Sequence, residues 1–245
     1  MTITLDAVEG LPEIQPGDDV AALVTRHAGS VRSGDVVVVA QKVVSKAEGR
    51  LRDLSTVSAS PRARRLAKHL AQDPRFVQLV LDESVRIVRQ DRILIVETPH
   101  GFICANAGVD RSNVDGADVV TLLPLDPDGS ARALRNRIGE IGGADVAVII
   151  SDTFGRPWRI GQVNAALGVF GMAAVVDHRG EPDDFGTPLQ STLIAVADEI
   201  AAATGLVMGK ARRVPAVVVR GIDGVDGRSG SGRELIRPPE LDLFR

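Results

Sequence analysis

The chain has 245 residues, of which 44% are hydrophobic, and its formal net charge is −3. This length allows a sizeable buried core, and the slightly acidic balance argues against a nucleic-acid partner held by bulk charge. The single cysteine excludes an intramolecular disulfide and, with only four histidines, argues against a zinc site of the usual Cys/His type.

Apolar runs rich in β-branched residues alternate with amphipathic segments along the chain. In chain order, the pattern predicts a helix at 18–28, a strand at 36–40, a helix at 61–72, strands at 93–96 and 119–123, a helix at 130–138, strands at 146–150 and 173–176, a helix at 188–204 and a strand at 214–219. The fold class is therefore mixed α/β, in one domain over 1–245 that could contain two structural subdomains. The Gly-rich tail at 221–237 is expected to be a mobile loop.

The segment 188–204 has the clearest helical signals. Thr187 can cap the helix, Pro188 suits the first helical position, and Gln190 completes a capping-box spacing. Gly205 stands where a helix commonly ends. These signals predict a helix that begins at Pro188 and ends just before Gly205.

Four polar stretches lie beside the apolar runs, at 10–19, 40–50, 106–114 and 149–162. Each has an ordinary structural explanation: a helix start, a solvated loop with a Lys–Glu pair, an Asx turn, and a salt-bridged loop around a core tryptophan, respectively. Each also has a functional one, because α/β proteins bind ligands beyond the ends of their strands. Residue chemistry alone leaves both explanations open.

The stretch 149–162 carries the strongest functional signal. Asp152 follows the apolar strand, where a buried carboxylate is costly unless it is paired or bound to a metal ion. Arg156 and Arg159 could each offer a planar fork to a phosphate or a carboxylate. Trp158, the only tryptophan of the chain, is expected to pack against the core.

Several common motifs are incomplete. The segment 205–211 resembles a phosphate loop, but three residues rather than four separate its glycines, and Ala211 replaces the metal-binding Ser or Thr. A nucleotide site here must therefore be of an uncommon type. No signal peptide and no run of about 18 apolar residues is present, so we expect a cytoplasmic protein without a membrane partner.

Spaced motifs in a fixed order resemble those of one family almost from end to end. They include GLPEI, QKVVSKAEGR, NAGVDRSNV, SDTFGRPWRIGQ, DHRGEPDDFGTPLQSTLIAVADEIA, LVMGKA and LIRPPELDLFR. This set resembles the coenzyme F420-0:γ-glutamyl ligases. Similar sequences also form the N-terminal half of a bifunctional actinobacterial enzyme that makes the same coenzyme, so the chain is expected to be either a stand-alone ligase or that half alone.

The resemblance implies a two-part α/β fold with mixed sheets, without a Walker loop, in an intertwined homodimer. It implies an enzyme that uses GTP to join L-glutamate to the lactyl-phosphate carboxylate of the deazaflavin F420-0 through an acyl phosphate. Further glutamate would be added through the γ-carboxyl of the first. Mg²⁺ or Mn²⁺, with two divalent ions expected, and a monovalent ion such as K⁺ are the implied cofactors.

The resemblance also assigns site residues. Asp110, Asp152 and Thr153 correspond to metal ligands, and hard oxygen donors of this kind suit Mg²⁺ or Mn²⁺. Asn164 and Lys210 depart from the family pattern, which is more acidic at both places, and this puts a metal contact at Lys210 in doubt. The implied nucleotide contacts are Leu11, Pro12, Glu13, Ile14, Gln41, Lys46, Asn113, Leu206, Val207, Met208, Gly209 and Lys210.

No residue stands out as the base that deprotonates the incoming amine. Arg156 and Arg159 are candidates for gripping the phosphodiester of the substrate or the glutamate carboxylates, and 221–232 is a candidate lid, because an acyl phosphate hydrolyses in water. Two alternatives stay open: a metal-dependent ligase for another acceptor or amino acid, and a non-catalytic GTP-binding protein. The intact set of metal ligands argues against the second.

Overall fold

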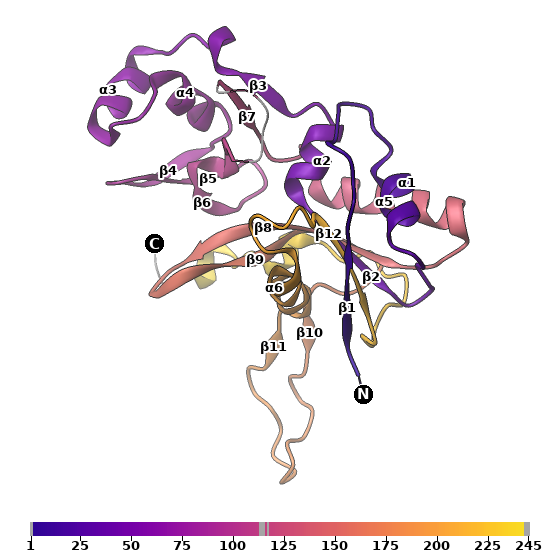
Figure 1. Cartoon of the computed structure of the whole chain (residues 1–245). Helices are drawn as coiled ribbons and strands as arrows, with labels where there is room; N and C mark the ends of the chain where they lie inside the picture. The colour runs from indigo at the N-terminus through magenta and orange to yellow at the C-terminus, as the bar shows by residue number, and fades with distance from the viewer. Residues whose placement is uncertain (1, 113–115, 117, 243–245) are drawn as a thin grey trace.

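The computed structural model describes residues 2–112, 116 and 118–242, which fold into two parts (Figure 1). The larger part is built on a mixed sheet in the order β1-β12-β2-β8-β9, in which β2 and β8 are parallel and the other neighbours antiparallel. Its strands are β1 (Thr4–Val8), β2 (Val36–Ala40), β8 (Ala147–Arg156), β9 (Arg159–Phe170) and β12 (Ala216–Arg220). One face is covered by α1 (Val20–His27), α2 (Gln41–Ala47) and α5 (Pro127–Gly142), and the other by α6 (Val196–Met208).

The apolar runs of this sheet are continuous because both of its faces are buried. In β2, Val37 and Val39 pack on the side of α1 and α5, whereas Val36 and Val38 pack on the side of α6. A strand that is covered on both faces needs apolar side chains at every position. The predictions of a mixed α/β fold and of a strand at 36–40 are confirmed.

The smaller part lies between β2 and β8 in the sequence. Its strands β3 and β7 pair with each other, so that the outgoing and returning chains run side by side, and β4, β5 and β6 form a second small sheet. Leu54, Val80 and Leu94 are fully buried in a core of its own. The elements are β3 (Leu51–Asp53), α3 (Pro61–Leu70), α4 (Pro74–Asp82), β4 (Arg86–Gln90), β5 (Leu94–Glu97), β6 (Ile103–Ala105) and β7 (Val119–Thr121).

Most of the predicted elements are present, with shifted ends. The helices expected at 18–28, 61–72 and 130–138 are α1, α3 and α5, and the strands expected at 93–96, 119–123 and 214–219 are β5, β7 and β12. Helix α5 begins earlier than expected, because Asp126 caps it by accepting a hydrogen bond from the Gly129 amide at 3.0 Å. The sequence pattern predicted neither α4 nor the short strands β1, β3, β4 and β6.

The prediction of a helix at 188–204 is wrong in its first half. Residues 178–192 instead form the loop of a projecting arm between β10 (Val176–Asp177) and β11 (Leu193–Ile194), and the strand expected at 173–176 is reduced to β10 (Figure 1). Thr187 does not cap a helix, because Asp183 accepts a hydrogen bond from its amide and bends the chain there. Gly205 lies inside α6, which ends at Met208.

Two of the polar stretches are regular structure rather than loops. Residues 41–47 form α2, with Gln41, Ser45 and Lys46 buried, so the solvated loop expected at 40–50 is wrong. Strand β8 continues through the polar residues to Arg156 and pairs with β9 along this whole length. The turn between them places Trp158 at φ 63° with its side chain 84% exposed, so the prediction that Trp158 packs in the core is wrong.

The Gly-rich tail runs back across the larger part and is anchored there. The Gly227 amide donates to the Gly171 carbonyl at 3.1 Å, and the Gly232 amide donates to Asp128 at 2.8 Å. A Cβ at Gly230 would lie 2.1 Å from the Met172 carbonyl oxygen, so the backbone passes too close for any other residue. In the part of the chain that is described, no helix is long and apolar enough to cross a membrane.

Candidate functional site

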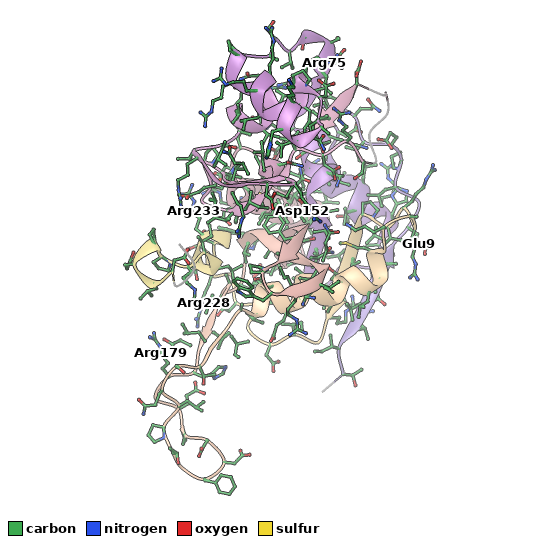
Figure 2. The ribbon with its side chains drawn as sticks, turned by 90° about the vertical axis from the view of Figure 1, so that its left-hand side faces the viewer. Glu9, Arg75, Asp152, Arg179, Arg228 and Arg233 are labelled. Atoms are coloured by element: carbon green, nitrogen blue, oxygen red, sulfur yellow. The ribbon has the colours of Figure 1, made fainter. Side chains whose placement is uncertain are left out.

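Two carboxylates and a lysine from distant parts of the sequence meet where the two parts of the fold join. Asp152 lies on β8, Asp110 pairs with Thr121 at the end of β7, and Lys42 lies in the first turn of α2. The Lys42 Nζ–Asp110 Oδ2 distance is 2.8 Å. Figure 2 shows Asp152 at the level where the upper and lower parts meet. The structure therefore brings together the two aspartates that were assigned as metal ligands.

The two carboxylates have opposite electrostatic surroundings. Burial raises the pKa of Asp152 above its ordinary value, and the negative charge of Asp110 adds to this effect, whereas Lys42 and Lys210 oppose it. Burial also acts to raise the pKa of Asp110, but hydrogen bonds from Lys42 and Ser112 outweigh it and leave that pKa lowered. Asp110 is thus compensated by its neighbours, and Asp152 is a half-buried acid that a bound cation would stabilise.

The Thr153 hydroxyl belongs to a different network. Successive strand residues point to opposite faces, so the Thr153 side chain points away from that of Asp152. Its Oγ1 accepts a hydrogen bond from Lys210 Nζ at 2.6 Å and lies 2.9 Å from Asn164 Oδ1, to which it donates. Asn164 Nδ2 reaches the Met208 sulfur at 3.6 Å. If Thr153 binds a cation together with Asp152, its carbonyl rather than its hydroxyl must do so.

The predicted nucleotide contacts lie on three segments around this junction. Lys46 on α2 is buried and pairs with Glu13 of the N-terminal loop, while Ile14 is buried in the core. The Gln41 amide donates to Ser45 Oγ at 2.6 Å and to the Leu122 carbonyl at 3.1 Å. Leu11, Pro12, Glu13 and Ile14 precede α1; Leu206, Val207 and Met208 form the last turn of α6, and Gly209 and Lys210 follow it. Asn113 lies outside the described residues.

Lys42 is a site residue that the sequence analysis did not assign. The sequence places it among the polar residues after the strand 36–40, where a lysine could hold a phosphate, but the resemblance gave site roles only to Gln41 and Lys46 in this stretch. The available signal was the position of Lys42 directly beyond the end of β2. Strand β8 runs parallel to β2, and the polar residues of β8 begin at the same level, where Ala40 pairs with Ser151. Residues beyond the ends of adjacent parallel strands lie at one edge of a sheet.

Arg156 and Arg159, which were proposed to bind substrate anions, lie further along the β8–β9 hairpin. Arg156 donates through Nη2 to the Ile160 carbonyl at 3.2 Å, and its Nε is buried without a partner among the described residues. Arg159 is exposed at the start of β9. The structure does not place either guanidinium against Asp110 or Asp152.

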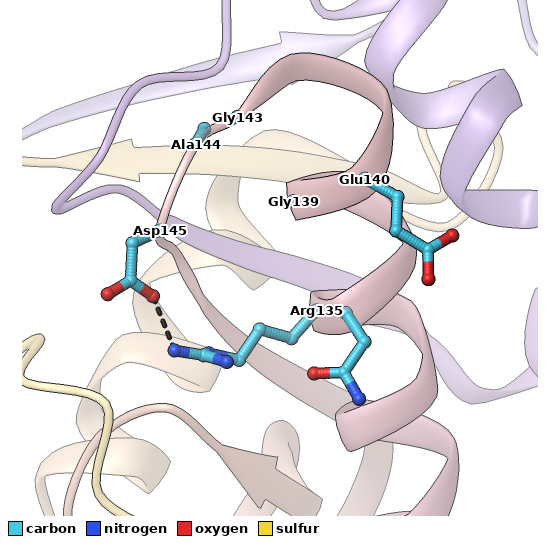
Figure 3. A pocket seen from close by; sticks show the side chains of 7 residues that line it. Arg135, Gly139, Glu140, Gly143, Ala144 and Asp145 are labelled. Carbon is cyan, nitrogen blue, oxygen red and sulfur yellow. Dashed lines mark hydrogen bonds and ion pairs between the residues drawn. The ribbon is translucent and has the colours of Figure 1, made fainter.

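Two hollows of the described surface lie away from the paired carboxylates. One of about 430 Å³ lies at the end of α5 (Figure 3), where Arg135 already pairs with Asp145 and no predicted site residue takes part. Another of about 260 Å³ lies between the β5–β6 loop and the C-terminal segment. The chemistry of the paired carboxylates, rather than the size of a hollow, identifies the candidate site.

The donor set suits a hard cation that substrate oxygens help to bind. No group of three or more His, Cys, Asp and Glu side chains that could hold a metal ion by itself occurs among the described residues. Mg²⁺ is commonly held by only one or two carboxylates together with substrate phosphates and water. Asp110 and Asp152 fit that pattern, so the residues present suit one such ion at a nucleotide.

Comparison with known proteins identifies the family. Residues 10–221 match the family described as F420-0:Gamma-glutamyl ligase. A coenzyme F420:L-glutamate ligase from Methanothermobacter thermautotrophicus is 46% identical, with 100% of each chain covered. The same enzyme from Haloarcula marismortui is 46% identical over 98% of this chain and 94% of its own, and that from Archaeoglobus fulgidus is 45% identical over 100% and 97%.

Proposed function

The chain belongs to the F420-0:γ-glutamyl ligase family, and from this premise we propose that it is a ligase that joins L-glutamate to coenzyme F420-0. The observation that supports this activity best is the pair Asp110 and Asp152 at the junction of the two parts, where Asp110 is charge-compensated and the pKa of Asp152 is raised. Two lysines act on the pair: Lys42 pairs with Asp110, and Lys210, which donates to Thr153 on the other face of β8, also acts to lower the pKa of Asp152.

The proposed reaction has two steps. The acceptor carboxylate attacks the γ-phosphorus of GTP, which forms an acyl phosphate and releases GDP. The amine of glutamate then attacks the acyl carbon, and inorganic phosphate leaves as the amide bond forms. Phosphoryl transfer needs positioning and charge neutralisation more than covalent chemistry from the protein. Lysine ammonium groups supply such neutralisation as point charges.

The metal assignment follows from the same residues. Asp110 and Asp152 would hold Mg²⁺ or Mn²⁺, and the ion would neutralise the oxygens of the nucleotide phosphates. Two such ions, K⁺, GTP as the nucleotide and a cytoplasmic location are proposed on the family resemblance alone. The tail segment 221–232, which was expected to form a lid, is anchored to the larger part through Gly171 and Asp128.

The direct test uses the purified chain with GTP, Mn²⁺, L-glutamate and F420-0. We expect GDP release and a product heavier by one or more glutamyl units, measured by mass spectrometry. Neither GDP nor a mass gain would refute the proposal. GDP release with another acceptor or amino acid, in a substrate panel, would support the broader ligase alternative, and tight GTP binding without any turnover would support a non-catalytic role.

Lys42 is expected to compete with the metal ion for Asp110. In Lys42→Met the ammonium no longer occupies the carboxylate, so Mn²⁺ binding without nucleotide should tighten about threefold to tenfold. Electron paramagnetic resonance of free Mn²⁺ measures this affinity. Lys68→Met, on the exposed side of α3, is the matched control and should leave the affinity unchanged. Weaker Mn²⁺ binding in Lys42→Met would show that Lys42 supports the ion instead.

We also propose that the chain is a homodimer, because large apolar side chains project from two hairpins. Phe185 on the arm is 95% exposed, and Trp158 and Ile160 on the β8–β9 turn are 84% and 101% exposed. Exposed apolar patches of this kind commonly mark interaction surfaces. Replacing 180–191 with a short Gly-Ser turn should convert a dimer to a monomer in light scattering. Leu125→Ser, at another exposed leucine, should leave the mass unchanged; an unaltered mass for the shortened arm would contradict the proposal.

A further inference from the structure

A hollow of about 260 Å³ lies between the β5–β6 loop and the C-terminal segment. Glu97, His100, Arg233 and Arg237 line it. Glu97 pairs with Arg86 at 2.7 Å, whereas neither the Arg233 nor the Arg237 guanidinium makes an ion pair or a hydrogen bond with any residue that the structure describes. The hollow therefore offers two positive charges that the fold does not use.

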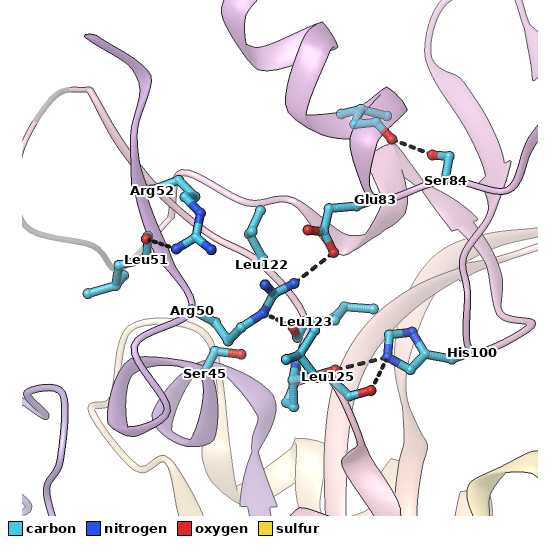
Figure 4. Close-up of polar contacts among 12 residues, drawn as sticks. Ser45, Arg50, Leu51, Arg52, Glu83, Ser84, His100, Leu122, Leu123 and Leu125 are labelled. Carbon is cyan, nitrogen blue, oxygen red and sulfur yellow. Dashed lines mark hydrogen bonds and ion pairs between the residues drawn. The ribbon is translucent and has the colours of Figure 1, made fainter. Parts of the chain in front are cut away.

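His100 adds a polar atom without a partner to the same lining. Its Nε2 lies 2.9 Å from the Pro124 carbonyl oxygen and 3.1 Å from that of Leu125, so the proton of the neutral ring resides on Nε2 (Figure 4). Nδ1 is buried and has no hydrogen-bond partner among the described residues. With the proton on Nε2, Nδ1 is a hydrogen-bond acceptor, so the ligand group that would satisfy it is an N–H donor such as an amide, and not an anionic oxygen.

The hollow is connected to Asp152 by a short path of packed side chains. Phe154 lies two residues beyond Asp152 on β8, on the same face and about 7 Å along the strand. Its ring packs edge-on against Phe102 at 6.2 Å, and Phe102 stacks on His100 at 5.7 Å. Ile236, which also lines the hollow, packs in the same cluster. The hollow is therefore joined to the strand that carries Asp152 by a continuous path of packed side chains.

We infer that this hollow binds the acidic chain of an acceptor that already carries a glutamyl unit. The inference rests on the proposed function, in which only the terminal carboxylate of the acceptor reacts at Asp110 and Asp152. An acceptor that carries one glutamate also has an α-carboxylate and a phosphodiester behind its reacting end. Each addition moves these anions further from the reacting carboxylate, toward the unpaired guanidinium groups of Arg233 and Arg237. Planar guanidinium forks match carboxylate and phosphate oxygens.

The test compares the first and second additions in the double variant R233E/R237E. The KM for the mono-glutamyl acceptor should rise at least tenfold, while kcat at saturation and the KM values for F420-0 and GTP change by less than about twofold. The products of the variant should therefore stop mainly at one glutamate. Both side chains are exposed and unpaired within the described chain, so the melting temperature should be unchanged.

Salt and a control variant separate an ionic subsite from a structural effect. Raising the salt concentration should raise the wild-type KM for the mono-glutamyl acceptor and leave that of R233E/R237E nearly unaffected, because exposed ion pairs are screened. Arg65→Glu, an exposed charge reversal on α3, should behave as wild type. The inference would be overturned if R233E/R237E were active and gave products with the same distribution of tail lengths as the wild type. It would also be overturned if the wild type never added a second glutamate. Either result would leave the proposed function standing. An inactive wild type would overturn the proposed function itself.

Discussion

Asp152→Asn is expected to lower kcat for ligation by at least about 1,000-fold. The substitution removes the carboxylate charge that would hold Mg²⁺ or Mn²⁺ beside Asp110. A catalytic metal ion contributes several kcal/mol of charge stabilisation in the transition state, and about 1.4 kcal/mol corresponds to a factor of ten in rate. GDP release measures the rate, and equilibrium binding of Mn²⁺ should weaken in parallel. Activity and metal affinity close to wild type would show that Asp152 is not a metal ligand.

The same substitution should raise the melting temperature of the metal-free protein at neutral pH. Burial raises the pKa of Asp152 in the folded state, so the unfolded chain ionises this carboxyl more readily. Asp152 therefore has no effect on the free energy of unfolding below its pKa in the unfolded chain, near 3.8. As the pH rises through its raised pKa in the folded state, Asp152 lowers that free energy. Asparagine carries no charge and avoids this loss, so the advantage of the variant should vanish below about pH 4.

Added Mn²⁺ should reverse the order of the two melting temperatures, so that the wild type melts above Asp152→Asn. The ion stabilises only the form that binds it, so it should raise the melting temperature of the wild type and have little effect on Asp152→Asn. Asp91→Asn, at an exposed position between β4 and β5, is the matched control and should show neither effect. A variant that melts below the wild type at neutral pH without metal would contradict the electrostatic argument.

Arg50→Met should destabilise the fold by about 3 kcal/mol and lower its melting temperature by roughly 6–12 °C. The Arg50 side chain is 9% exposed, and its Nη2 pairs with Glu83 Oε2 at 2.7 Å (Figure 4). Its Nε donates to the Leu123 carbonyl at 2.8 Å. Methionine would leave a half-buried carboxylate and a buried carbonyl unpaired. The expected loss of stability is smaller than for a fully buried ion pair because the Glu83 side chain is 21% exposed.

The control for Arg50 lies two residues further on. Arg52 is exposed, and its Nη1 donates only to nearby carbonyl groups, such as that of Leu51 at 2.8 Å. Arg52→Met should therefore change stability by less than about 0.5 kcal/mol. Thermal unfolding followed by circular dichroism distinguishes the two variants. Equal, small shifts in both would mean that the Arg50–Glu83 pair contributes nothing to holding α4 on the rest of the fold.

The sequence predicted those elements whose causes are local. The run at 36–40 indicates a strand because burial of both faces requires an apolar residue at each position. Ser60 and Pro61 mark the start of α3, where the Ser60 side chain accepts from the Ala63 amide. Thr187 and Pro188 carry equally good local signals, yet they lie in the projecting arm, where Asp183 binds the Thr187 amide.

The candidate site also has some features that the sequence predicted and others that depend on tertiary structure. Asp110 and Asp152 could be assigned because their motifs resemble those of a known family. Their surroundings depend on tertiary structure, since Lys42 comes from α2 and Lys210 from the end of α6. No spacing in the sequence indicates that Lys210 binds the Thr153 hydroxyl. The prediction for Trp158 was wrong for a related reason. A tryptophan side chain suggests burial, but the position of Trp158 in a two-residue hairpin turn exposes it.

The pairing of β1 with β12 has a consequence for synthesis on the ribosome. Thr4–Val8 emerges long before its sheet partner, Ala216–Arg220, and a Cβ at the adjacent Gly221 would lie 2.2 Å from the Thr2 carbonyl oxygen. Residues 51–121, by contrast, contain a core of their own and emerge well before β8. The nascent chain should therefore gain its first protease-resistant fragment in this inserted segment, while β1 stays unpaired until β12 has emerged.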